Sequence, residues 1–189
     1  MDAVSWAAEL HRDQWRDGVE PVPYLCHPLE VLTLVRYVGR VEDPSVLCAA
    51  VLHDVVEETE ATVKDVRDRF GAVTAGLVQE LTRTEPTPAE TEGLDADEVW
   101  ALRSAMLLSE IAQMGPIAGT IKLADRISNL REARHSKRGK KLTRYVEQSK
   151  RILGIVPKSV NPWLWSELKT EAGRGGKKAA KRNRRALRG

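Results

Sequence analysis

A histidine and an aspartate, His53 and Asp54, stand side by side at the end of the apolar stretch 46–52. Apolar residues over this length predict a buried helix, and burying either polar group is costly unless it is paired or binds a metal ion. Imidazole and carboxylate ligands together suit Mn²⁺, Fe²⁺ or Zn²⁺. Because capped helix ends often carry such a pair without any metal, the dipeptide alone leaves both interpretations open.

Two residues elsewhere in the chain favour the metal interpretation. His27 follows an apolar stretch and precedes Pro28, a residue suited to the first turn of a helix. Asp125 lies within residues 121–127, where apolar neighbours predict a buried helix and an unpaired carboxylate would be costly. Together with the His-Asp pair they offer nitrogen and oxygen ligands but no cysteine, which argues against a structural zinc site.

Polar side chains at helical spacing accompany Asp125. Lys122 precedes it by three residues and Asn129 follows it by four, so the three share one face of the expected helix. We predict that Lys122 and Asn129 bind substrate there. The alternative is a surface ion pair between Lys122 and Asp125 beside a solvated Asn129, which the apolar neighbours make the weaker interpretation.

Two adjacent glutamates, Glu57 and Glu58, follow the His-Asp pair closely. Glu57 comes three residues after Asp54 and shares its face if the helix continues. A carboxylate at that place could act as a general acid or base in metal-assisted hydrolysis. Taken without the other residues, the pattern favours a solvated acidic turn, since Glu60 follows closely.

The elements expected to position these residues are helices almost throughout, because apolar residues recur near the helical period and aromatic content is only 5%. Proline, glycine and capping residues mark the breaks. We expect helices over residues 4–15, 28–38, 43–53, 62–70, 72–83, 97–113, 117–131, 142–153 and 161–172. Residues 84–96 and 134–141 are expected to be loops, the first of them mobile. The predicted fold is a single all-α domain, a helical bundle over residues 1–172.

The last segment, residues 173–189, differs from the rest in composition. It holds eight of the lysines and arginines and no acid, so the net charge of +3 leaves −5 for residues 1–172. A like-charged run with few apolar residues is expected to be disordered. Weak contact with nucleic acid or another polyanion and a purely solubilising role are both open interpretations.

Several kinds of protein are disfavoured by composition. No apolar run approaches the roughly 20 residues that span a bilayer, and the N-terminus shows no signal-peptide pattern. Two cysteines are too few for a disulfide framework. We therefore expect a cytoplasmic protein that makes no membrane contact, and the sequence leaves its oligomeric state open.

Taken together, these residues resemble the HD-domain superfamily of metal phosphohydrolases, which carries the order His, His-Asp, Asp. The resemblance is greatest to the hydrolase domain of RelA/SpoT proteins and to the small alarmone hydrolases, over roughly residues 1–155. It rests on five blocks in the same order: HRDQWR at 11–16, PYLCHPLEV at 23–31, AAVLHDVVEET at 49–59, FG at 70–71 and IKLADRISNLR at 121–131.

The resemblance implies a role for each matched residue. The metal would be Mn²⁺, held by His27, His53, Asp54 and Asp125. Glu57 would be the catalytic carboxylate, with Glu58 assisting. Arg16 would stack on the guanine base, and Asn129 would contact the nucleotide near the scissile phosphate. The reaction would remove the 3′-pyrophosphate of ppGpp or pppGpp, giving GDP or GTP and pyrophosphate.

Three positions depart from the family pattern. Glu58 stands where the family usually has Asp, Ser128 replaces a ring residue, and Glu132 stands where the family often carries Thr. An acid near an anionic substrate would be unfavourable unless it points away. These changes keep two alternatives open: a hydrolase on the same scaffold for another nucleotide, such as NADPH or a nucleoside monophosphate, and an inactive domain that binds nucleotide or nucleic acid.

Overall fold

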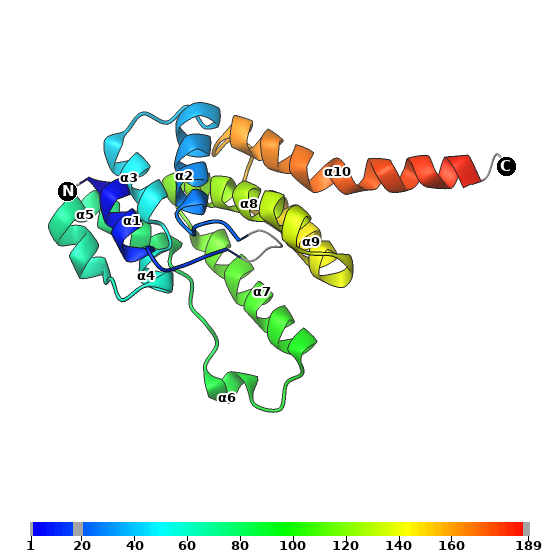
Figure 1. The fold of residues 1–189 in the computed structure, drawn as a ribbon, viewed down its shortest axis with the longest axis horizontal. Coiled ribbons are helices and arrows are strands. Elements are labelled where there is room, and N and C mark those ends of the chain that lie inside the picture. Colours follow the sequence, from blue (N-terminus) through cyan, green and yellow to red (C-terminus); the bar gives the residue numbers. More distant parts are fainter. Residues whose placement is uncertain (1, 17–20, 187–189) are drawn as a thin grey trace.

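The computed structural model describes the backbone of residues 2–16 and 21–186, and side chains as far as Arg174. In this part of the chain every regular element is a helix (Figure 1). The elements are α1 (Ala3–Leu10), α2 (Cys26–Thr33), the π-helix η1 (Leu34–Val38), α3 (Pro44–Leu52), α4 (Val55–Glu58), α5 (Val63–Leu81), α6 (Pro88–Thr91), α7 (Ala96–Gln113), α8 (Pro116–Ser136), α9 (Gly139–Ile155) and α10 (Pro162–Ala186). The prediction of an all-α fold is confirmed.

Helix α8 forms the centre of the fold. All of its residues from Ala118 to Ser128 are buried, and α2, α5, α9 and α10 pack against it. A helix this enclosed can keep polar residues only where they find partners. Lys122 and Asp125 pair with each other within α8. Arg126 donates to Ser149 on α9, and Ser128 donates to Glu30 on α2.

The helices that carry the N-terminal motifs begin where capping residues predict. The Asp43 carboxylate accepts hydrogen bonds from the backbone N–H groups of Ser45 and Val46 and so caps α3. Thr62 and Asp65 form a capping box at the start of α5. Gly71 interrupts α5 with a φ of 86°, a left-handed conformation suited to glycine, at the break that the sequence predicts.

Several of the expected boundaries are wrong. The expected loop at residues 84–96 contains the short helix α6, and the last expected helix continues to Ala186. The first helix ends at Leu10, because His11 turns into the core and the chain then forms an isolated bridge between Trp15 and Pro23. Most of the expected loop at residues 134–141 is helical: α8 continues to Ser136 and α9 begins at Gly139. The Arg138 guanidinium donates to the carbonyls of Arg134 and His135 and satisfies the end of α8.

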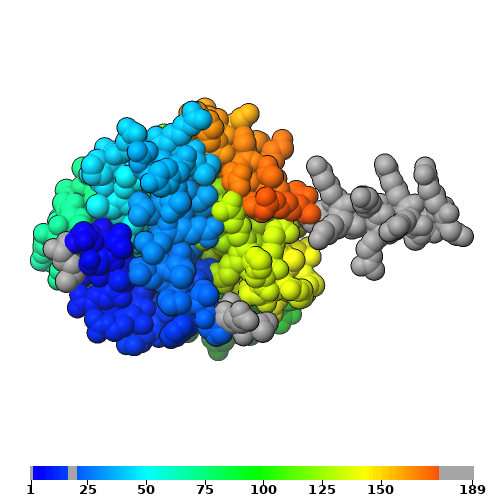
Figure 2. Space-filling model, turned by 45° about the horizontal axis from the view of Figure 1, so that its top comes forward, coloured from blue at the N-terminus to red at the C-terminus, as the bar shows by residue number. Residues whose placement is uncertain are grey.

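The first part of helix α10 packs on the body of the molecule (Figure 2), and the ribbon of the helix then extends beyond it (Figure 1). Leu164 and Leu168 are fully buried, and the Asn161 amide donates to the Gly39 carbonyl at 2.9 Å. A side chain at Gly39 would meet the Val35 carbonyl at 2.7 Å, so glycine permits this close approach. The disorder expected for residues 173–189 stays a prediction, because residues 187–189 and the side chains after Arg174 lie outside the described part. No helix in the described ranges is both long and apolar enough to cross a membrane.

Candidate metal centre and substrate pocket

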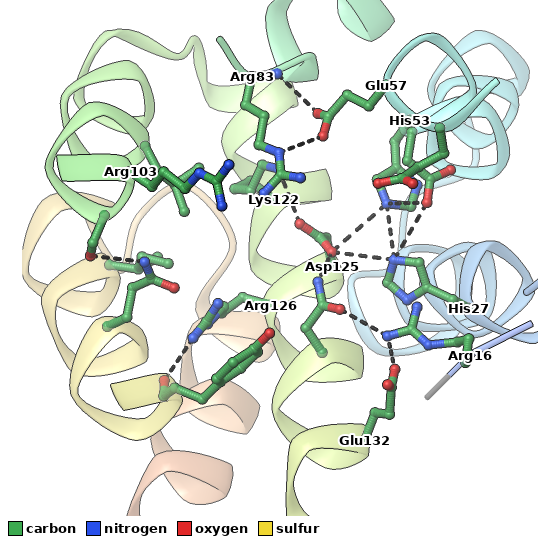
Figure 3. Close-up of a pocket in the computed structure, with 18 of the residues that line it drawn as sticks. Arg16, His27, His53, Glu57, Arg83, Arg103, Lys122, Asp125, Arg126 and Glu132 are labelled. Carbon is green, nitrogen blue, oxygen red and sulfur yellow. Dashed lines mark hydrogen bonds and ion pairs between the residues drawn. The ribbon is translucent and has the colours of Figure 1, made fainter. Parts of the chain in front are cut away.

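Predicted residues from distant parts of the chain meet at one point of the core, where ligand atoms of His27, His53 and Asp125 all lie within 4.8 Å of one another (Figure 3). His27 lies in the first turn of α2, His53 and Asp54 lie between α3 and α4, and Asp125 lies on α8. The Nε2 atoms of His27 and His53 are 3.2 Å apart, and the nearer Asp125 oxygen is 3.4 Å from the first and 3.8 Å from the second. An Asp54 oxygen lies 3.8 Å from both Nε2 atoms.

Hydrogen-bond partners fix the orientation of the two imidazoles. The Nδ1 atom of His53 lies 3.0 Å from the Ala50 carbonyl, which can only accept, so this nitrogen carries the hydrogen. The Nδ1 atom of His27 lies 2.9 Å from the Ser128 hydroxyl, which itself donates to Glu30. Nδ1 of His27 is therefore also a donor, so each ring, when neutral, has the lone pair of its Nε2 facing the other ring.

The charges of the cluster favour a cation between its imidazole nitrogens and carboxylate oxygens. Burial would lower the pKa of His53, but the charges of Asp54 and Asp125 outweigh it and raise that pKa to about 9. Burial lowers the pKa of His27. Burial would raise the pKa values of both aspartates, yet neighbouring histidines, and for Asp125 above all the Lys122 ammonium, hold them below the usual range. Once His53 gives up its Nε2 proton, two lone pairs and two ionised carboxylates in a buried space suit a divalent metal ion.

Asp54 is held by two residues that the sequence did not single out as functional. The Tyr24 hydroxyl donates to one of its oxygens at 2.8 Å, and Nε2 of His11 lies 3.6 Å from the other. The His11 and Tyr24 rings stack with centroids 4.7 Å apart. Both residues fall inside matched sequence blocks, so the blocks were a usable signal, but nothing local in the sequence indicates a partner at Asp54.

Glu57 and Glu58 both lie in the short helix α4 but face different surroundings. The Glu57 carboxylate accepts from the Arg83 backbone N–H at 2.9 Å and pairs with the Arg83 guanidinium at 2.8 Å. Its pKa is raised, chiefly by burial. The Glu58 side chain is exposed, and its backbone carbonyl accepts from Gln14. Both line the pocket, so the two predicted carboxylates are brought to one site but only Glu57 is enclosed there.

The cluster opens into a cavity of about 540 Å³, a volume in the range of small-ligand pockets. Among the described residues, six carboxylates line the cavity, two of them from the metal cluster. Six cationic side chains line it as well and can meet an anionic ligand. They include the predicted Lys122 and Arg16 and four cations that the sequence did not mark: Arg83, Arg103, Arg126 and Lys137. Lys122 donates to Asp125 at 3.0 Å, and Asn129 also donates to Asp125.

The Arg16 side chain reaches α8, where it meets Glu132 (Figure 3). Its guanidinium donates to the Asn129 side-chain oxygen at 3.0 Å and pairs with Glu132. The guanidinium carbon also lies 5.5 Å from the centroid of the Tyr24 ring. Glu132 therefore does not point away from the pocket: it lines it and offsets the charge of Arg16.

The opposite wall of the cavity comes from α7 and α9. The Arg103 guanidinium pairs with Glu85 at 2.8 Å, and the Gln148 amide donates to the Ser104 hydroxyl at 2.9 Å. Arg126 crosses to α9, where it donates to the Tyr145 carbonyl at 2.7 Å. Sequence reasoning missed this wall because its residues are far apart in the chain and follow no motif.

Residues 3–152 of the chain match the family described as HD domain, which covers every helix that contributes to the cluster. The chain belongs to the HD-domain family. This HD domain is 36% identical to a Drosophila melanogaster protein named guanosine-3′,5′-bis(diphosphate) 3′-pyrophosphohydrolase MESH1. The comparison covers 132 residues, which are 70% of this chain and 68% of that protein. The human protein of the same name is 33% identical over 132 residues, with 70% and 68% covered.

Solved structures give the same relationship in three dimensions. The HD domain superposes on the structure of a metazoan orthologue of SpoT, described as hydrolysing ppGpp, with a TM-score of 0.77. Identity in that comparison is 30%, and 92% of each chain is covered. A Streptomyces coelicolor GTP pyrophosphokinase is 37% identical over 138 residues, which are 73% of this chain and 15% of that longer protein.

Proposed function

We propose that the protein hydrolyses the 3′-pyrophosphate of the guanosine alarmones ppGpp and pppGpp, giving GDP or GTP and pyrophosphate. The observation that carries this proposal is a buried cluster of His27, His53 and Asp125, with Asp54 beside the two histidines, at the edge of a cavity with arginine and lysine side chains in its lining, in a chain similar to enzymes named for this reaction. We also place the protein in the cytoplasm, where removal of alarmones would end the stringent response that they signal.

We propose His27, His53, Asp54 and Asp125 as the metal ligands and Mn²⁺ as the metal. Mixed nitrogen and oxygen donors suit Mn²⁺, although the same donors also suit Fe²⁺ and Zn²⁺. A divalent ion bound there would lower the pKa of water and offset phosphate charge. The chain contributes the rest: Tyr24 and His11 orient Asp54, and Lys122 holds Asp125.

Glu57 is the residue that we assign to proton transfer. A general acid or base works best when its pKa is near the working pH, and burial already raises the pKa of Glu57. Arg83 holds its carboxylate at the cavity wall. Glu58 is exposed and one position further along α4, so we assign it an assisting role at the pocket edge.

We assign the nucleoside end of the substrate to the mouth of the cavity. Arg16 lies over the Tyr24 ring and would stack on guanine, while Asn129 would contact the ribose side near the scissile phosphate. The phosphate groups would extend toward Lys122 and the α7 wall, where Arg103 lies.

A different nucleotide is the second candidate, and one observation favours it. Glu132 pairs with Arg16, so the residue expected to stack on guanine is partly neutralised and tied to α8. The part of the cavity assigned to the nucleoside therefore differs from the family pattern, while the metal cluster does not. This combination would suit a substrate other than ppGpp, such as NADPH or a nucleoside monophosphate.

The deciding experiment incubates the purified protein with Mn²⁺ and, in parallel, ppGpp, NADPH and GMP. Release of pyrophosphate and GDP from ppGpp alone is the expected result. Asp125→Asn is the matched control, because it removes one proposed ligand and should abolish whichever release the parent protein shows. Phosphate release from NADPH or GMP, with ppGpp intact, would replace the proposed function with the second candidate.

A further inference from the structure

A continuous line of hydrogen bonds leaves the metal cluster on the side away from the cavity. Nδ1 of His27 donates to the Ser128 hydroxyl at 2.9 Å, and that hydroxyl donates to Glu30 at 2.7 Å. The second Glu30 oxygen accepts from the Arg131 guanidinium at 2.9 Å. None of these three partners lines the cavity, so they cannot serve by contacting substrate.

The line continues from Arg131 into α10. The same guanidinium donates to Glu167 at 2.6 Å and to Glu171 at 3.1 Å. Glu171 is fully buried and also accepts from Arg174 at 2.6 Å. One arginine therefore ties the last helix of the chain to Glu30, two hydrogen bonds away from His27.

The charge of Glu30 determines the direction of these bonds. An ionised carboxylate can only accept, so the Ser128 hydroxyl must give its single hydrogen to Glu30. The hydroxyl then has only lone pairs left for His27, whose Nδ1 must carry a hydrogen. A neutral imidazole with hydrogen on Nδ1 has its free lone pair on Nε2, the atom that faces His53 and Asp125.

We propose that Ser128 and Glu30 are positioning residues that hold His27 in the tautomer able to bind the metal, and that α10 keeps Glu30 in place through Arg131. This inference rests on the proposed function for the presence of a metal. It also explains a role for Ser128, which stands where the family pattern has a residue with a ring side chain. Partners behind metal-binding histidines typically change metal affinity or activity by about 10- to 100-fold when removed.

The test uses two substitutions in the full-length protein. Ser128→Ala removes the acceptor of the His27 hydrogen. Glu30→Gln keeps the size of the side chain but supplies an amide that can donate to Ser128, which frees the hydroxyl to donate to Nδ1 and favours the wrong tautomer. The matched control is Glu42→Gln, which makes the same change in the exposed pair between Glu42 and Arg36.

Three measurements separate positioning from a merely structural role. Calorimetric titration of the metal-free protein with Mn²⁺ should give affinities roughly 10- to 100-fold weaker for both variants and unchanged for the control. Nitrogen NMR of the metal-free protein should place the His27 hydrogen on Nδ1 in the parent and shift it toward Nε2 in Glu30→Gln. Thermal unfolding in chelator reports whether each variant is folded, and kcat at saturating Mn²⁺ should stay near the parent value.

The outcomes distinguish this inference from the proposed function. If the parent binds Mn²⁺ while both folded variants bind it equally well with His27 unchanged, the positioning role is wrong. A parent that binds Mn²⁺ but leaves ppGpp intact overturns the proposed function and leaves the positioning role standing. A parent that binds no divalent metal ends both.

Discussion

The two sides of the cavity are built in different ways. The metal side places its side chains at helix ends or on the enclosed helix α8, and each of its four proposed ligands is at most 7% exposed. The α7 side relies on half-exposed cations such as Arg103, which are held only by pairing with neighbours such as Glu85. The backbone thus fixes the metal side of the cavity. The α7 side is defined by exposed side chains, which can be substituted without disturbing the core. We therefore expect substitutions on the metal side to stop the reaction and substitutions on the α7 side to change substrate affinity.

The largest effect on turnover with the metal still bound is expected for Glu57→Gln. The amide keeps the size of the side chain but cannot transfer the proton, so kcat should fall by roughly 10²-fold or more. Metal content should match the parent, since Glu57 is not among the proposed ligands. Initial rates at saturating Mn²⁺ and metal analysis of the purified variant provide the measurement.

Asp54→Asn is the comparison for that variant. It weakens the cluster itself, so both metal content and rate should fall. If Glu57→Gln hydrolyses ppGpp at the parent rate, Glu57 serves only to hold Arg83, and the catalytic carboxylate must be sought at Glu58.

The next largest effect is expected on the opposite wall, for Arg103→Ala. A charge-assisted hydrogen bond contributes about 1.5–3 kcal/mol, so KM for ppGpp should rise by about 10-fold or more while kcat changes little. Steady-state kinetics give both constants. Arg151→Ala, an exposed α9 substitution outside the cavity, is the control. A fall in kcat with unchanged KM would place Arg103 in the chemistry and break the division between the two sides.

The same division explains how much the sequence could predict. His53, Asp54 and Asp125 were predictable because each sits in or beside an apolar helix, where an unpartnered polar group is costly. Arg103 and Tyr145 were not, because they meet the cavity only through the packing of α7 against α9. The partners of Asp54 were missed for a similar reason: His11 reaches it from the turn that ends α1 earlier than helical periodicity suggests, and Tyr24 from the turn before α2.

A smaller effect is expected at Glu132, between the two sides. Glu132→Thr installs the residue that similar proteins often carry, removes a negative charge from the pocket and releases Arg16 from its ion pair. Partly buried pairs of this kind contribute about 1 kcal/mol or less once solvent screening is included, so KM for ppGpp should fall about 3- to 5-fold. Parallel assays with ppGpp and NADPH measure the change. An unchanged KM for ppGpp, or a lower one for NADPH only, would show that Arg16 does not bind guanine.

The smallest effect is expected for removal of residues 175–189. They lie beyond every residue of the cavity and beyond Arg174, so the bonds between α10, Arg131 and Glu30 remain after truncation. Hydrolysis of free ppGpp should therefore stay near the parent rate. Any polyanion binding that the basic segment provides should be lost, and in the parent it should weaken steeply with salt, because it would arise from counterion release. Rates and nucleic-acid binding at two salt concentrations, for parent and truncated protein, test both expectations. A folded truncation with a strongly reduced rate would show that the segment acts on the cavity, and the line of bonds through Arg131 would then be the first route to examine.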